Sequence, residues 1–223
     1  MKHHTSKQDI KIAVDAVIFT IKDDALQVLL IQMKKTPFED MWAVPGGLLD
    51  DDETARLGAQ RILGMQTGVS SVYLEQLKTF DAVDRDPAGR VISIAYYALF
   101  PNNDVELHTT DKYKSVKWWS VSKLPKLAYD HKQIIETAVD RLSAKIQYTN
   151  IVWSLLPEEF TLTEIQHVYE VIMGRTLDKR NFRKRINELR MIKPTGKKRY
   201  GMAHRPAALY TFKHRELEFV EVV

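Results

Sequence analysis

The sequence contains no cysteine, which excludes disulfides, thiolate metal ligands and cysteine nucleophiles. No apolar run approaches the roughly 18 residues that a membrane-spanning helix needs. Residues 1–9 are polar and lack the apolar core of a signal peptide, and the chain shows neither internal repeats nor low-complexity tracts. Hydrophobic residues make up 44% of the chain and charged residues 28%, as in an ordinary globular protein. We therefore expect a cytoplasmic protein with no membrane partner.

The length of 223 residues suits a domain of about 150 residues with a small companion. The pattern changes near residue 147, because no strand-like run appears in the next forty residues or so. We expect a first domain at residues 1–147 and a second at residues 148–223.

The pattern of the first domain predicts an α/β fold. Apolar, β-branched runs predict strands, and periodic apolar positions predict helices. The expected strands cover residues 10–21, 26–32, 42–44, 72–80, 91–100 and 116–120, and the expected helices cover residues 51–65 and 131–146. Gly58 and Gly64 each cost the first helix about 1 kcal/mol relative to alanine, so that helix depends on packing or on close backbone approach.

The second domain has the parts of a winged helix-turn-helix. Thr161 and Glu164 fit a capping box at a helix start, and Gly174 is a stop signal for that helix. A second helix is expected at residues 178–190, followed by strands at 191–194 and 208–212 around a basic loop. In such a fold the second helix enters the major groove of DNA.

Charge is concentrated in this second domain. Residues 175–205 hold twelve lysines and arginines against two acidic residues, a net charge of +10, whereas the whole chain carries +4. Such a charged segment can be a solvated basic face or a surface that binds a polyanion. The expected fold favours the second interpretation, with double-stranded operator DNA as the partner. The expected DNA contacts are Lys179, Arg180, Asn181, Arg183, Lys184, Asn187, Lys197, Lys198, Arg199, His204 and Arg205. One small module neutralises few phosphates, so we also expect a homodimer.

The stretch from Pro45 to Val69 resembles a Nudix box, whose pattern is G-x5-E-x7-R-E-U-x-E-E-x-G-U with U aliphatic. The residues in register are Gly47, Glu53, Arg61, Leu63, Gly68 and Val69. The resemblance spans about residues 9–142 and implies the Nudix α/β/α sandwich with a mixed sheet.

Three glutamates of that box hold Mg²⁺ in active Nudix hydrolases. The corresponding residues are Ile62, Met65 and Gln66, and neither Ile nor Met can ligate a hard cation. We therefore expect no resident metal, no cofactor and no enzymatic activity. The alternative is a hydrolase that recruits metal through Glu53 and the aspartates at residues 50–52.

A Nudix domain without these glutamates, followed by a basic winged helix, resembles the Nudix-related transcriptional regulators of bacteria. The resemblance implies a dimeric repressor of NAD-metabolism genes whose Nudix domain senses ADP-ribose or a related nucleotide. Other members of the family govern sugar utilisation, which keeps a phosphosugar-like effector open. A Nudix domain that serves only as a dimerisation scaffold is the third possibility.

A diphosphate ligand requires fixed cations, donors and close backbone approach. The candidate ligand-binding residues are Lys34, Lys35, Trp42, Gly46, Gly47, Arg85 and Arg90. Several have structural alternatives. Arg85 and Arg90 could instead pair with Asp84 or Asp86, Trp42 could be a core residue, and the glycines could serve a turn.

Overall fold

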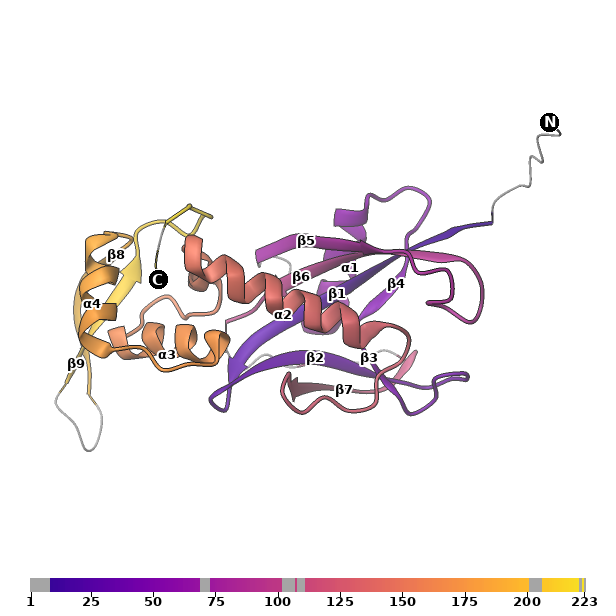
Figure 1. Ribbon diagram of the computed structural model, residues 1–223, viewed down its shortest axis with the longest axis horizontal. Coiled ribbons are helices and arrows are strands. Elements are labelled where there is room, and N and C mark those ends of the chain that lie inside the picture. The colour runs from indigo at the N-terminus through magenta and orange to yellow at the C-terminus, as the bar shows by residue number, and fades with distance from the viewer. Residues whose placement is uncertain are drawn as a thin grey trace.

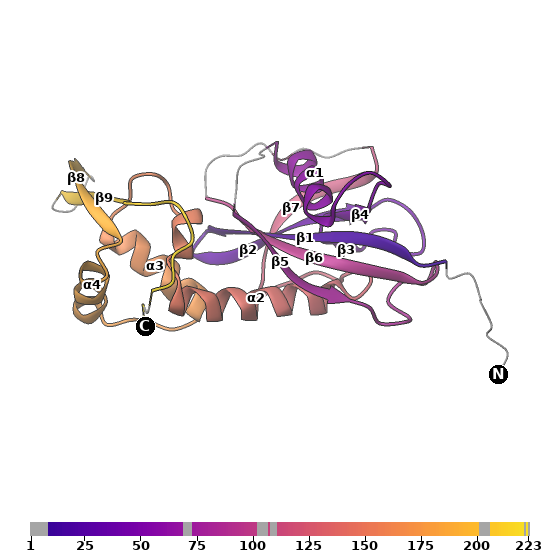
Figure 2. The same cartoon turned by 90° about the horizontal axis from the view of Figure 1, so that it is seen from above.

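The computed structural model describes residues 9–68, 73–101, 107, 111–200, 206–220 and 222. Its first part is built on a seven-stranded mixed sheet with a helix on each face, and its second part lies at one end of the sheet (Figures 1 and 2). Within the described residues, no helix is both long enough and apolar enough to cross a membrane.

The strands of the sheet are β1 (Lys11–Lys22), β2 (Ala25–Met33), β3 (Trp42–Ala43), β4 (Gly46–Leu48), β5 (Tyr73–Phe80), β6 (Val91–Leu99) and β7 (Tyr113–Ser120). The central path runs β3-β2-β1-β6-β5, with β4 paired to β1 and β7 paired to β2. Only the β1–β6 pair is parallel among these described pairings. The α/β sandwich with a mixed sheet is confirmed.

Strand β1 divides the core between the two helices, because successive side chains point to opposite faces. Val14, Ala16 and Ile18 pack in one cluster with helix α1 (Ala55–Thr67). Val17 and Phe19 pack in another with helix α2 (His131–Tyr148). This alternation places Asp15, with the odd-numbered residues, on the face that α2 covers.

The second part is a winged helix-turn-helix. It consists of the 3-10 helix η1 (Ile151–Ser154), helices α3 (Leu162–Met173) and α4 (Lys179–Glu188), and strands β8 (Ile192–Arg199) and β9 (Ala207–Phe212). Both bonds of the capping box at Thr161 and Glu164 are present, and Gly174 ends α3 in the left-handed conformation at φ 63°, as the sequence predicts.

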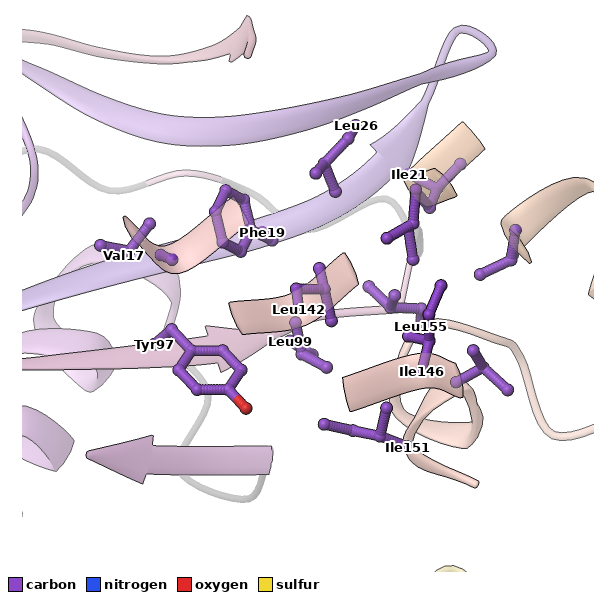
Figure 3. Packing of buried hydrophobic residues seen from close by; sticks show 14 of the residues in the cluster. Val17, Phe19, Ile21, Leu26, Tyr97, Leu99, Leu142, Ile146, Ile151 and Leu155 are labelled. Atoms are coloured by element: carbon purple, nitrogen blue, oxygen red, sulfur yellow. The ribbon is translucent and has the colours of Figure 1, made fainter. Parts of the chain in front are cut away.

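The two parts share one apolar cluster. Phe19 and Ile21 of the sheet, Ile146 of α2 and Ile151 of η1 pack together, and the same cluster continues into α3 and α4 (Figure 3). His167 Nε2 of α3 lies 3.1 Å from Oδ1 of Asp24 in the β1–β2 turn. The winged helix is therefore packed on the sheet domain through buried side chains.

The two glycines within α1 differ in their surroundings. A Cβ on Gly58 would lie 2.6 Å from Cδ2 of Leu49, whereas a Cβ on Gly64 would meet nothing within 4 Å. We expect Gly64→Ala to raise the free energy of unfolding by about 1 kcal/mol and Gly58→Ala to lower it through overpacking. Urea denaturation of the two variants measures this difference, and a destabilised Gly64→Ala would contradict it.

Candidate functional site: a cavity and a basic helix

A cavity of about 210 Å³ lies where β1, β4 and the start of α2 meet. Its lining consists of Ala13, Asp15, Ile31, Met33, Ala43, Val44, Gly46, Gly47, Leu48, Arg85, Asp86, Val91, Lys112, Tyr113, Tyr129 and His131. Apolar walls with a few convergent polar groups are what small-molecule sites present. The cavity brings together three of the candidate ligand residues, Gly46, Gly47 and Arg85.

Arg85 is the buried cation of this cavity, with 4% of its side chain exposed. Its Nε and Nη2 donate to the two carboxylate oxygens of Asp130 at 3.0 and 2.8 Å. Nη2 also donates to Asp15 Oδ2 at 3.3 Å. Burial by itself would lower the pKa of Arg85, but the hydrogen bonds to Asp130 and the charge of Asp15 outweigh it and raise that pKa. The guanidinium therefore keeps its charge.

The alternative pairing of Arg85 with Asp84 or Asp86 is not among its described contacts; its partners come from β1 and from the residue before α2. Asp15 stands out in the sequence as a lone carboxylate inside the apolar run of β1, and this signal could have found it. Asp15 also accepts from Ser93 Oγ at 2.6 Å. Gly46 lies opposite it, and a Cβ at residue 46 would overlap the Asp15 carboxylate.

The other candidate ligand residues lie outside the cavity lining. Trp42 is 9% exposed and packs edge-on against Trp119 at 5.2 Å between ring centroids. Arg90 donates to the carbonyls of Asp81 and Ala82. Lys34 donates to the carbonyl of Asp111 at 3.3 Å, and Lys35 is exposed. Lys112, Tyr113 and Tyr129 line the cavity, and sequence reasoning missed them.

His131 is the first residue of α2, and its imidazole closes the cavity. Its Nδ1 accepts from the Val44 amide at 3.1 Å, so in the neutral ring the proton sits on Nε2. That nitrogen lies 3.6 Å from Asp15 Oδ1. Desolvation lowers the pKa of His131, against the opposing charges of Asp15 and Asp130.

The lowered pKa of His131 predicts a pH dependence of stability. The unfolded chain takes up this proton below about pH 6.5, the ordinary pKa of histidine, while the folded ring stays neutral. Stability from this residue is thus present above pH 6.5 and is lost as pH falls, by up to about 1.4 kcal/mol per pH unit. Denaturation between pH 7.5 and 5 should show a shallower slope for His131→Gln than for the parent. Exposed His214→Gln controls for loss of an imidazole, and equal slopes in the His131 variant and the parent would contradict the prediction.

At the three glutamate positions of the box, helix α1 carries Ile62, Met65 and Gln66. Ile62 is 3% exposed and packs with Ala59 and Leu63 in the apolar cluster on its face of the sheet. Gln66 is 1% exposed, and its Oε1 has no hydrogen-bond partner among the described residues. Glu53 is bound to Arg61, whose hydrogen bonds lower the pKa of Glu53 to about 2. No described α1 residue lines the cavity, and the described residues contain no cluster of three acidic, histidine or cysteine side chains that could hold a metal.

The second candidate site is the outer face of α4. Asp178 caps this helix by accepting from the Asn181 amide at 2.8 Å, while Phe182 and Ile186 are buried against the core. The predicted contacts Lys179, Arg180, Asn181, Lys184 and Asn187 are exposed. Arg183 is half-buried, and its Nη2 donates to Thr163 of α3 at 3.4 Å.

The turn between α3 and α4 is held by two α3 side chains that sequence reasoning missed. Glu170 accepts from the Leu177 amide at 2.8 Å, and Gln166 Nε2 donates to the Leu177 carbonyl at 3.0 Å. The hydrogen bond from the Leu177 amide lowers the pKa of Glu170. These bonds fix the angle at which α4 leaves α3.

The wing is anchored to the start of α3. Lys197 pairs with Glu159 at 2.8 Å, and Arg199 pairs with Glu164 of the capping box. Lys198 is exposed. The predicted contacts His204 and Arg205 lie outside the described residues.

A sheet domain with a Nudix-type box and a cavity, joined to a winged helix with an exposed basic α4, defines a two-domain DNA-binding regulator. Comparison with family models agrees with both halves. The NUDIX domain matches residues 10–138, and the NrtR DNA-binding winged helix domain matches residues 152–212.

Similarity to known proteins extends over nearly the whole chain. The chain is 36% identical over 210 residues to the ADPR responsive transcriptional repressor NtrR of Acinetobacter baylyi, covering 92% of this chain and 83% of that protein. Shewanella oneidensis NrtR complexed with a 27mer DNA has a TM-score of 0.81 at 37% identity, covering 91% of this chain and 93% of that one. The NUDIX domain of the Shewanella protein, solved with ADP ribose, has a TM-score of 0.55 at 36% identity and covers 60% of this chain and 90% of that one. The chain belongs to the NrtR family of Nudix-related transcriptional regulators.

Proposed function

We propose that this chain is a transcriptional repressor that binds operator DNA through α4 and the wing and senses ADP-ribose in the cavity of its Nudix domain. The observation that carries the proposal is the exposed basic face of α4 in a helix-turn-helix whose turn is fixed by Glu170 and Gln166. Similarity to an ADPR responsive repressor over most of the chain supports it.

On this proposal residues 1–147 form the effector domain and residues 148–223 the DNA-binding domain, and the protein acts as a homodimer in the cytoplasm on genes of NAD metabolism. Two modules of a dimer would read two half-sites about one helical turn apart. The base-reading residues would be Arg180, Asn181, Lys184 and Asn187, with Lys179 and Lys198 on phosphates.

We also propose that the Nudix domain binds its ligand without hydrolysing it. The phosphate-bridging metal of Nudix hydrolases would need three carboxylates on one face of α1, and Ile62 and Gln66 are buried there instead. Without those carboxylates, α1 would hold no metal to polarise a diphosphate or to lower the pKa of an attacking water.

Two measurements test these proposals separately. Fluorescence anisotropy with the DNA upstream of the protein's own gene, with and without ADP-ribose, should show tight binding that ADP-ribose changes; binding no stronger than to scrambled DNA would refute the regulator. Incubation with ADP-ribose and Mg²⁺ should release no AMP. Release at enzymatic rates would refute the silent Nudix domain and leave the DNA-binding result standing.

A further inference from the structure

Asp130 occupies the N-cap position of α2, yet its carboxylate makes no capping hydrogen bond to the helix. Aspartate at this position ordinarily accepts from the helix's own amides. Here both carboxylate oxygens are bound by Arg85. The first turn of α2 is therefore tied to a side chain of the cavity wall.

The other end of α2 is tied to the winged helix. Leu142 and Ile146 belong to the apolar cluster that contains Ile165 and Val168 of α3. Figures 1 and 2 show α2 running along the sheet from the region of β3 to the winged helix. One helix thus touches the cavity with its first turn and the DNA-binding part with its last.

A C-terminal segment fastens that last turn. The amides of Val220 and Val222 donate to the carbonyls of Tyr148 and Gln147 at 2.9 Å each. Asn150, which is buried, donates from Nδ2 to the Glu216 carbonyl and accepts at Oδ1 from the Glu218 amide. The last turn of α2 and Asn150 beyond it are therefore hydrogen-bonded to the same C-terminal segment.

An anionic ligand in the cavity would compete with Asp15 and Asp130 for the guanidinium of Arg85. Among the described lining residues the cations are Arg85 and Lys112, whereas Asp15 and Asp86 are acidic and His131 is held neutral. Arg85 is already shared between Asp15 and Asp130. A bound diphosphate requires a cation, and Asp15 stays anchored by Ser93, which leaves the Asp130 bond as the one to be exchanged.

We infer, resting on the effector function proposed above, that the Arg85–Asp130 pair is the contact through which an anionic nucleotide in the cavity acts on the winged helix. The ligand's diphosphate draws the guanidinium away from Asp130, the first turn of α2 is released, and its far end shifts the winged helix. Asp130 is a positioning residue in this scheme, because it acts through Arg85 and α2. A ligand shifts a protein between two states only if it binds one of them more tightly. Here the two states are those with Arg85 bound to Asp130 and with Arg85 released to the ligand, and the ligand binds the second more tightly.

The test compares Asp130→Asn with Asp86→Asn in the full-length protein. Asp86 lines the same cavity, but its described side-chain hydrogen bond is local: Oδ1 accepts from the Ala88 amide at 2.8 Å, and an asparagine Oδ1 can accept the same bond. Each variant removes one negative charge, so calorimetry should show ADP-ribose binding several-fold tighter in both. The ratio of operator Kd with and without ADP-ribose should fall several-fold toward one in Asp130→Asn and stay at the wild-type value in Asp86→Asn. A wild-type ratio in Asp130→Asn overturns the inference.

A second measurement uses the wild-type protein and needs no substitution. Hydrogen exchange of amides in the first turn of α2 should become faster when ADP-ribose is added, since that turn loses its tie to Arg85. Unchanged or slower exchange overturns the inference. A wild-type protein that binds no ADP-ribose in calorimetry refutes the proposed effector function itself, and this outcome is distinct from a bound ligand without release of α2.

Discussion

Replacement of Arg85 by methionine is expected to lower the free energy of unfolding by about 3–5 kcal/mol and to abolish measurable binding of ADP-ribose. The stability loss follows because Asp15 and Asp130 would remain at a buried site without their cation, and breaking one side of a buried pair costs that much. The loss of binding follows because the cavity would keep its acidic residues and lose its buried cation. Denaturation in urea and calorimetry measure the two effects.

Arg90→Met is the matched control, since it makes the same replacement of a guanidinium side chain at the residue directly before β6. Arg90 donates to the exposed carbonyls of Asp81 and Ala82, which water can replace, so its loss should cost about 1 kcal/mol. Equal losses in the two variants would contradict the assigned role of Arg85. A triple variant, Asp15→Asn/Arg85→Met/Asp130→Asn, should recover part of the stability because no buried charge is left unpaired.

Substitution of Arg180 and Lys184 together by alanine should weaken operator binding by about 10²–10³-fold. Each side chain is exposed on the face of α4 opposite buried Phe182 and Ile186, and each interaction with a base edge or phosphate is worth about 1–3 kcal/mol. The slope of log affinity against log salt should also fall, by about 1 for every phosphate that the variant no longer neutralises. Anisotropy titrations at several salt concentrations give both quantities.

The control for this variant is Lys123→Ala/Lys132→Ala, which removes two exposed positive charges from the sheet domain. It should leave operator affinity and salt slope close to wild type, because long-range attraction is screened beyond about 10 Å at ordinary ionic strength. A matching loss of affinity in the control would mean that overall charge, and not the α4 face, determines binding.

The elements with strong local signals could be predicted from the sequence. Apolar, β-branched runs predicted β1, β2 and β6. The bonds that make a capping box are local to Thr161 and Glu164, so the start of α3 could be placed to the residue. Strand β4 was missed, since Gly46 and Gly47 have little strand propensity. It forms because a glycine at 46 can lie against Asp15 where any side chain would collide.

The cavity was harder to predict because its polar groups come from distant parts of the chain. Arg85 was identified as a candidate, but its partners Asp15 and Asp130 lie 70 and 45 residues away, and only the folded sheet brings them together. The partners of the wing side chains were also hard to predict, because they come from another part of the chain. Positive charge at Lys197 and Arg199 predicted a DNA contact, whereas the fold pairs both with carboxylates near the start of α3; their direct role on DNA stays a prediction.

The apolar cluster shared by the two parts bears on how the response of such a regulator to its effector can change by mutation. The winged helix packs on the sheet domain through side chains such as Ile21, Ile146 and Leu155, and packed interiors respond to a change of even one methylene. If the winged helix shifts as inferred above, a substitution there would change the balance between the two arrangements while leaving the DNA-binding and ligand-binding surfaces intact. On that inference, the effector concentration needed to change DNA binding depends on the packing of this apolar cluster, and it can change without any change in the residues that contact DNA or ligand.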